Sequence, residues 1–93
     1  MIRSFRDSEA AKLFHDEFSK KYRAIERTAR RKLMMLDGAE NLQDLALLPG
    51  TRLEALQGDG KGQHSIRING QYRICFTWRE GNADNVEITK HYR

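Results

Sequence analysis

The sequence predicts a single α+β domain, because its periodicity changes once, from helical to extended, along 93 residues. Residues 8–38 carry apolar side chains at helical spacing, residues 53–92 alternate as strands do, and residues 39–52 connect the two halves. A run of helix followed by a run of strands is typical of α+β folds. At this length we expect one domain over residues 1–93, since two halves would each be too small to bury a stabilising core.

A short first helix is expected directly after an extended segment over residues 2–5. Asp7 or Ser8 can cap the N-terminus of this helix. Phe14 and Phe18 lie four residues apart, which is the spacing of side chains on one helical face. The helix is therefore expected to include both phenylalanines.

A second helix is expected from about Ala24 to Asp37, with Gly38 as its C-cap. Its apolar stripe consists of Tyr22, Ile25, Ala29, Leu33 and Leu36. The remaining face is strongly basic and carries Lys20, Lys21, Arg23, Arg27, Arg30, Arg31 and Lys32, with Glu26 as the one acid. Such a face is either an ordinary solvated surface or a contact for a phosphate backbone or an acidic partner.

The overall composition indicates which kinds of partner the protein binds and in which cellular compartment it lies. A net charge of +4 favours an anionic partner such as nucleic acid or an acidic protein. The single cysteine, Cys75, excludes an internal disulfide and fits a reducing compartment. The longest apolar run is Leu45–Leu48, and the N-terminus lacks a leader-like apolar region, so we expect a cytoplasmic protein without membrane contact. The histidines are dispersed, and no metal site is expected.

The second half contains a hairpin whose geometry follows from its pattern. An Asn-Gly pair at positions 69–70 marks the turn. A two-residue turn would place the apolar residues of the two strands on opposite faces of the sheet. A three-residue loop or a bulge is therefore expected, with Ile68 opposite Tyr72. The same alternation places Arg67 opposite Arg73 on the polar face.

Other parts of the chain receive simpler interpretations. Leu42–Leu45 could form a helical turn, and Arg52–Gln57 is expected to be a strand. Tyr72 and Trp78 are assigned to the core, and His64 is interpreted as a packed or interfacial histidine on the apolar face.

The polar face of the predicted sheet is the candidate site. Two arginines directly opposite each other destabilise a sheet unless an anion lies between them. Thr89 and His91 fall on the same face of the last strand, so guanidinium forks that match phosphate oxygens would lie near an imidazole that exchanges protons around neutral pH. This combination suits phosphodiester chemistry without a metal. The alternative is a solvated face on which an arginine pairs with Glu54 or Glu87.

Four segments of the second half resemble the HigB toxins, plasmid-maintenance killer proteins of the RelE/ParE superfamily. They are Arg-Leu-Glu-Ala-Leu-Gln-Gly-Asp (52–59), Gly-Gln-His-Ser-Ile-Arg-Ile-Asn (62–69), Gln-Tyr-Arg-Ile-Cys-Phe-Thr-Trp (71–78) and Val-Glu-Ile (86–88). The opening Met1–Phe5 and the helical Arg31–Asp37 are also similar, so the resemblance covers nearly the whole chain.

The resemblance implies the RelE-like fold, a curved antiparallel sheet with two N-terminal helices packed on one face. It implies a type II toxin that cleaves mRNA on the ribosome without a metal or other cofactor. In this reaction the 2′-hydroxyl attacks the adjacent phosphate and leaves a 2′,3′-cyclic phosphate. It also implies a HigA-type helix-turn-helix antitoxin, and contact with operator DNA only through that antitoxin.

The resemblance also assigns roles residue by residue. It gives Arg73 the stabilisation of transition-state charge and gives Arg67 the binding of a phosphate. Arg73 is expected to face solvent, so that its removal should leave folding nearly intact. The tails of the family usually end in an Asp-Tyr-His-like sequence, whereas residues 90–93 here are Lys-His-Tyr-Arg and lack the acid. His91 is therefore the candidate acid or base, with Tyr92 as a stacking group or alternative proton donor.

Two further sets of phosphate contacts are expected. Gln57 stands where some members of the family carry a basic residue, and Lys61 could take over that contact. The basic helical segment would bind ribosomal RNA or acidic residues of the antitoxin through Lys20, Lys21, Arg23, Arg27, Arg30 and Arg31.

Two other functions stay open at the level of the sequence. One is a ParE-like toxin that inhibits DNA gyrase and cleaves no RNA. The other is a degenerate toxin that only binds its antitoxin and operator DNA, an interpretation kept open by the missing C-terminal acid. The Tyr72-Arg73 pair and the His91-Tyr92 tail favour the nuclease.

Overall fold

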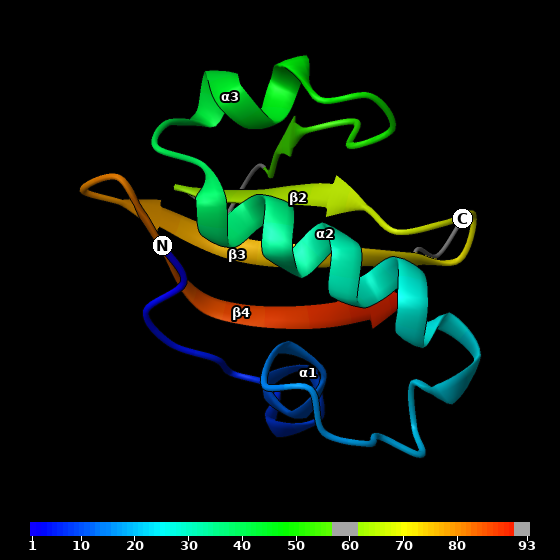
Figure 1. Cartoon of the computed structure of the whole chain (residues 1–93). Helices are drawn as coiled ribbons and strands as arrows, with labels where there is room; N and C mark the ends of the chain where they lie inside the picture. The colour runs from blue at the N-terminus through cyan, green and yellow to red at the C-terminus, as the bar shows by residue number, and fades with distance from the viewer. Residues whose placement is uncertain (57–61, 91–93) are drawn as a thin grey trace.

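The strands form one curved antiparallel sheet in the order in which they occur along the chain (Figure 1). The computed structural model describes residues 1–56 and 62–90. The strands are β1 (Glu54–Ala55), β2 (Gln63–Arg67), β3 (Tyr72–Arg79) and β4 (Asn82–Lys90). The predicted α+β fold is confirmed, although β1 is shorter than the expected strand over residues 52–57.

The hairpin between β2 and β3 has the predicted three-residue loop. The backbone N–H of Ile68 donates to the carbonyl of Tyr72 at 2.9 Å, so these two residues close the loop. The side-chain oxygen of Asn69 accepts from the backbone N–H groups of Gln71 at 2.8 Å and of Tyr72 at 2.9 Å. This Asx-type turn fixes the loop at residues 69–71 and keeps the apolar residues of both strands on one face.

A bulge in β4 preserves the same separation of faces between β3 and β4. The pairing shifts between Cys75 and Thr77, and Asn85 adopts a positive φ of 54°, which asparagine tolerates better than most residues. Ala83 and Val86 lie three positions apart and are both fully buried. The extra residue therefore restores the inward direction of the apolar side chains before the end of β4.

The N-terminal segment extends the sheet along the free edge of β4. Ile2 forms a parallel bridge with Ala83, and Phe5 forms one with Val86. The backbone N–H of Arg3 donates to the carbonyl of Ala83 at 2.8 Å. The expected first strand thus consists of isolated bridges that satisfy the polar backbone groups of the β4 edge.

The first helix, α1 (Ser8–Phe14), is shorter than expected. Asp7 caps it, and the Oδ1 atom of Asp7 accepts from two backbone N–H groups of the first turn at 3.0 and 3.2 Å. The chain leaves the helix at Asp16, which has a φ of 63°. Phe18 lies beyond the helix and is 63% exposed, so its expected place on the helical face is wrong.

The second helix lies across one face of the sheet (Figure 1). A 3₁₀ turn, η1 (Arg23–Ile25), leads into α2 (Glu26–Gly38). The expected apolar stripe of this segment is buried in full. The helix α1 lies beside β4 and packs against both α2 and β4. The core between α2 and the sheet includes Leu33, Leu36, Ile66, Ile74 and Phe76.

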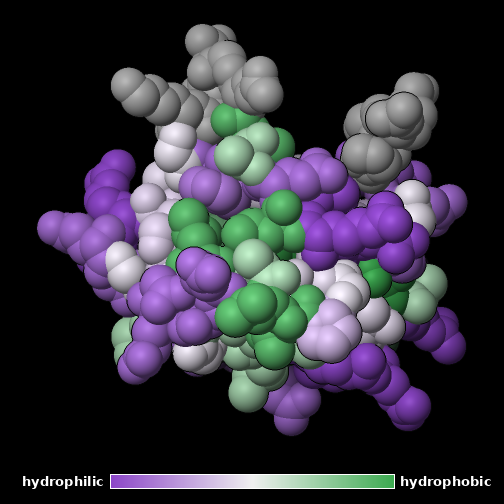
Figure 2. Space-filling view, turned by 90° about the horizontal axis from the view of Figure 1, so that it is seen from above, coloured by the Kyte–Doolittle hydropathy of each residue, from purple (hydrophilic) through white to green (hydrophobic). Residues whose placement is uncertain are grey.

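The connection between α2 and the sheet contains a third helix, α3 (Leu42–Leu47). Its N-terminus has a capping box in which Asn41 and Asp44 accept from each other's backbone N–H groups. Figure 2 views the molecule from the α3 side and shows apolar side chains gathered at the centre of this face. The exposed large apolar residues include Met34 on α2 and Leu47 on α3. No helix in the described part of the chain is both long and apolar enough to span a membrane.

Candidate functional site

The polar face of the sheet brings the two predicted arginines together. Arg67 on β2 is directly opposite Arg73 on β3, and Thr89 on β4 is opposite Arg73 from the other side. Cys75 shares this face, with its sulfur 3.4 Å from the hydroxyl oxygen of Thr89. The predicted alternation is therefore correct for every described residue of the candidate site.

Arg73 is held much more firmly than expected. Its Nε atom donates to the hydroxyl of Ser65 at 2.9 Å, and its Nη2 atom donates to the carbonyl of Arg52 at 3.1 Å. The same Nη2 atom lies 3.4 Å from a carboxylate oxygen of Glu54, as the alternative interpretation of the sequence anticipated. Arg73 is 9% exposed, so the expectation of a solvent-facing side chain is wrong. The reason is that Arg52 and Glu54, at the start of β1, lie against its guanidinium.

These contacts leave part of the Arg73 fork available. Within residues 1–56 and 62–90, its Nη1 atom makes no hydrogen bond. The guanidinium is thus fixed by protein acceptors on one side while one nitrogen can donate to a bound anion. A fixed, partly available donor of this kind is suited to stabilising charge that develops during a reaction.

Arg67 differs from Arg73 because its guanidinium makes no ion pair with the described residues. Its backbone N–H donates to the carbonyl of Thr51 at 2.6 Å. Nearby, the ammonium of Lys32 is buried and donates to the carbonyl of Gly50 at 3.1 Å. Burial lowers the pKa of Lys32, and the positive charges of Arg31 and Arg67 lower it further. The candidate site is therefore bordered by closely spaced positive charge.

The basic segment divides into exposed and structural residues. Arg30 was expected to contact phosphate, but its fork is taken up by the carbonyls of Leu13 at 2.9 Å and Glu17 at 3.0 Å and by the carboxylate of Glu26 at 2.8 Å. Arg30 therefore fastens α2 to the end of α1 and is not available as predicted. The other predicted contacts in this segment are exposed: Lys20, Lys21, Arg23, Arg27 and Arg31.

Three predicted site residues, Lys61, His91 and Tyr92, lie outside the described residues. The last described residue, Lys90, is paired with Tyr72 in the β3–β4 register and directly precedes His91 in the sequence. The assignment of proton transfer to His91 or Tyr92 stays a prediction, as does the phosphate contact of Lys61.

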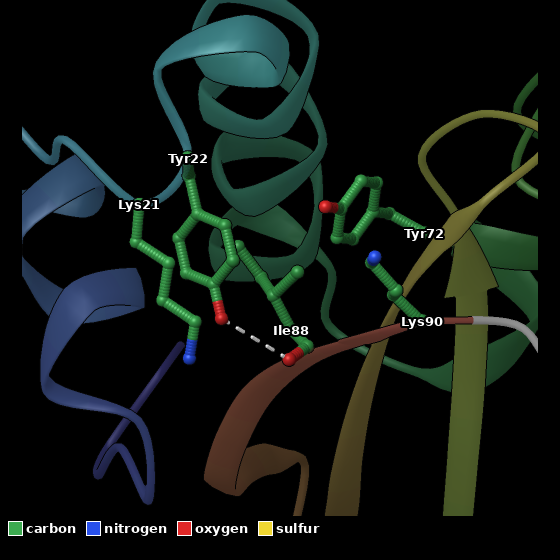
Figure 3. A pocket seen from close by; sticks show the side chains of 5 residues that line it. All are labelled: Lys21, Tyr22, Tyr72, Ile88 and Lys90. Atoms are coloured by element: carbon green, nitrogen blue, oxygen red, sulfur yellow. Dashed lines mark hydrogen bonds between the residues drawn. The ribbon is translucent and has the colours of Figure 1, made fainter.

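Sequence reasoning missed a pocket at the same end of the sheet, on the side that faces the helices (Figure 3). The pocket encloses about 310 Å³ and is lined by Lys21, Tyr22, Tyr72, Ile88 and Lys90. Tyr72 and Trp78, which were expected to belong to the core, are half-buried and pack against it, and Tyr72 also forms one wall of the pocket. The sequence did contain a sign of this pocket. Ile88 and Lys90 are two positions apart on the last strand, so Lys90 points to the same helical side of the sheet as Ile88.

Tyr22 is fixed in this pocket by a partly buried hydrogen-bond network. Its hydroxyl donates to the Oδ2 atom of Asp7 at 2.7 Å and lies 3.3 Å from the carbonyl oxygen of Ile88. The same Oδ2 atom of Asp7 accepts from the backbone N–H of Ile88 at 3.2 Å. Burial raises the pKa of Tyr22, and the hydrogen bond to Asp7 raises it further, so the hydroxyl stays neutral and the ring stays in place.

Several solved structures share this arrangement of sheet and helices. The toxin–antitoxin complex of YoeB and YefM from Staphylococcus aureus matches with a TM-score of 0.60 and 18% identity, covering 100% of this chain and 99% of that chain. A mutant of YafQ from E. coli matches with a TM-score of 0.59 and 12% identity, covering 98% of this chain and 94% of that chain. At these identities the likeness establishes the fold.

The sequence itself establishes the family. Residues 3–91 match the family described as the RelE-like toxin of the type II toxin-antitoxin system HigB, and the chain belongs to this family. The predicted resemblance is therefore confirmed. Toxin HigB-1 of Vibrio cholerae serotype O1 (strain ATCC 39315 / El Tor Inaba N16961) is 39% identical in an alignment that covers 98% of each chain.

Proposed function

We propose that this toxin is a ribosome-dependent mRNA endonuclease that inhibits translation in the cytoplasm. The observation that carries the proposal is the Arg73 guanidinium beside Arg67, which is fixed by Ser65 and Arg52 and whose Nη1 atom makes no hydrogen bond to residues 1–56 or 62–90. Membership of the HigB-like toxin family supports it.

The proposed reaction is an internal attack on a phosphodiester. The 2′-hydroxyl of one nucleotide loses its proton and attacks the adjacent phosphorus, while the bond to the 5′-oxygen of the next nucleotide breaks. The leaving 5′-oxygen gains a proton, so the products are a 2′,3′-cyclic phosphate and a 5′-hydroxyl. Arg73 stabilises the extra negative charge on the phosphoryl oxygens, and Arg67 binds a neighbouring phosphate.

Proton transfer is assigned to the C-terminal residues that follow Lys90. His91 is the candidate acid or base, because an imidazole exchanges protons near neutral pH. Tyr92 is a stacking group or an alternative proton donor. Lys61 is a further phosphate contact.

The proposed partners are the ribosome with its bound mRNA and a HigA-type helix-turn-helix antitoxin. Five exposed basic residues support contact with an RNA backbone or with acidic antitoxin residues: Lys20, Lys21, Arg23, Arg27 and Arg31. Operator DNA would be reached only through the antitoxin.

Primer extension on a reporter mRNA after brief expression of the toxin tests the proposal. New stops within the translated region are expected for the wild type and for Arg79→Ala, a matched control at the exposed far end of β3. The stops should be lost in Arg73→Ala and weakened in His91→Ala. If Arg73→Ala cleaves like the wild type, the assignment of Arg73 is wrong.

Growth arrest without any new stops would overturn the nuclease and favour the ParE-like alternative. A DNA-supercoiling assay with purified gyrase then decides, because inhibition by the wild type would establish that alternative.

A further inference from the structure

The pocket on the helical side of the sheet combines two aromatic rings with two cations (Figure 3). The rings of Tyr22 and Tyr72 meet edge to face, with their centroids 6.2 Å apart and their planes at 82°. The Nζ atom of Lys21 lies 5.3 Å from the centroid of the Tyr22 ring, and the Nζ atom of Lys90 lies 6.0 Å from that of Tyr72. Each ring therefore makes a cation–π contact with one lysine ammonium group.

The floor and one wall of the pocket are rigid. Ile88 lies at the base between the two rings, and the Tyr22 hydroxyl is held by Asp7 at 2.7 Å. Tyr72 is half-buried, and no acidic residue lines the pocket within the described part of the chain. An anionic ligand would thus meet two cations, while the carboxylate of Asp7 is occupied by the Tyr22 hydroxyl at 2.7 Å and the Ile88 N–H at 3.2 Å.

The pocket is adjacent to the candidate nuclease site through the backbone. Tyr72 directly precedes Arg73 on β3, and Lys90 directly follows Thr89, which is opposite Arg73. Successive residues of a strand point to opposite faces, so the pocket and the Arg73 site lie on the two faces of the same sheet end. Both strands reach the end of the sheet at the Tyr72–Lys90 pair. A strand of RNA could pass round this end and contact both faces.

We propose that this pocket is a base-binding subsite for single-stranded RNA. One nucleobase stacks on the Tyr72 ring, and Lys21 and Lys90 bind the phosphates on either side of that base. Aromatic rings bind bases by stacking with little dependence on sequence, and lysines bind the flanking phosphates as point charges. This inference rests on the proposed function, because it supplies a neighbouring nucleotide of the RNA that Arg73 would cleave.

Binding of a non-cleavable probe tests the subsite separately from catalysis. The probe is a fluorescein-labelled 2′-O-methyl hexanucleotide, and its affinity for the purified toxin is measured by anisotropy at several salt concentrations. Tyr72→Leu should weaken binding about 5- to 160-fold, the range for losing one base–aromatic stack. Tyr72→Phe keeps the ring and should bind like the wild type. Lys90→Ala should make the slope of log affinity against log salt shallower by about 0.7, the value for one phosphate contact on a single strand.

Control variants separate the subsite from loss of fold or general charge. Lys12→Ala removes an exposed lysine on α1 that does not line the pocket, and it should leave binding almost unchanged. Thermal unfolding of each variant shows whether it is folded. If Tyr72→Leu is unfolded, the comparison of Lys90→Ala and Tyr72→Phe with the wild type still tests the subsite.

Several outcomes would overturn the subsite. One such outcome is an equal affinity of Tyr72→Leu and the wild type for the probe. Another is an equal loss of affinity in Tyr72→Phe and Tyr72→Leu, because stacking on the ring would then not be the cause. A loss of affinity for purified antitoxin in Tyr72→Leu, with RNA binding intact, would assign the pocket to a protein partner instead.

Measuring mRNA cleavage alongside probe binding separates failure of the subsite from failure of the proposed nuclease function. Wild-type toxin that binds the probe through Tyr72 and cleaves no mRNA would overturn only the nuclease. Toxin that cleaves mRNA through Arg73, with Tyr72→Leu as active as the wild type, would overturn only the subsite.

Discussion

Replacing Arg73 by alanine should cost stability as well as activity, because the structure buries this side chain. The substitution removes the donor to Ser65, a residue that is 1% exposed and whose hydroxyl would then have no partner among residues 1–56 and 62–90. A hydrogen bond from a charged group contributes about 1.5–3 kcal/mol. The ion pair with Glu54, whose side chain is 58% exposed, contributes about 0–1 kcal/mol. Removal of the repulsion from Arg67 returns a few tenths of a kcal/mol, on the order seen for cross-strand pairs.

The expected net loss is about 2–3 kcal/mol in the free energy of unfolding. Urea denaturation followed by the fluorescence of Trp78 measures it, and the midpoint should fall by about 1–2 M. Cleavage should fall by about 10²-fold or more, the scale for one lost charge-stabilising donor. An unchanged urea midpoint would refute the structural argument, and wild-type cleavage would refute the catalytic one.

A second variant separates the two effects. Ser65→Ala removes the acceptor of the Arg73 Nε atom at 2.9 Å but keeps the guanidinium. It should lose part of the stability and lower cleavage less than Arg73→Ala does. If the two variants were equally inactive at equal folded fractions, the charge of Arg73 would not be the important property.

Three further predictions follow from the network around α1 and the N-terminal segment. Asp7→Ala removes a helix cap and the acceptor for both Tyr22 and Ile88, and should lower the free energy of unfolding by about 2–4 kcal/mol in urea denaturation; a midpoint equal to the wild type would contradict this. The pKa of Tyr22 is raised above its ordinary value of 10.0 by burial and by Asp7, so its contribution to stability is complete below pH 10 and is lost as the pH rises further. The tyrosinate absorbance of the folded protein should therefore contain a late-ionising fraction that is absent from Tyr22→Phe, and an identical titration of both proteins would count against the network. The hydrogen bond from Arg3 lowers the pKa of Asp84 below its ordinary value of 3.8, so the stabilising effect is present above that pH and is lost as the pH falls through the lowered value. Asp84→Asn should thus be less stable than the wild type at pH 7, with a difference that shrinks below pH 4 in acid unfolding curves; a constant difference would exclude the pair as its cause.

The hairpin and the pairing of its arginines could be predicted because they depend on local alternation. The apolar residues at 66, 68, 72 and 74 can share one face only with an odd loop, and the structure has that loop. The same rule placed Arg67, Arg73 and Thr89 on one face. The cap at Asp7 and the apolar stripe of α2 are likewise local patterns.

The burial of Arg73 could not be predicted from alternation alone. A polar face is exposed only where nothing covers it, and here Arg52 and Glu54 lie against the guanidinium. Arg30 is a similar case, because its acceptors Leu13 and Glu17 become neighbours only when α1 packs against α2. In both cases a basic side chain suited to phosphate is used, wholly or partly, by distant backbone carbonyls.

The tyrosine pocket depends on tertiary structure in the same way. Lys21 and Tyr22 come from the segment before η1, whereas Tyr72, Ile88 and Lys90 come from two strands near the other end of the chain. Each of the two tyrosines fits a core position when it is considered alone. Only their packing leaves a pocket between them.

Cleavage of end-labelled mRNA in a reconstituted translation mixture tests the central claim most directly. Purified wild-type toxin should cut ribosome-bound mRNA to fragments with a 2′,3′-cyclic phosphate and a 5′-hydroxyl, and Arg73→Ala should cut at least about 10²-fold more slowly while Arg79→Ala keeps the wild-type rate. An absence of fragments with the wild type, or equal rates for wild type and Arg73→Ala, would contradict the account.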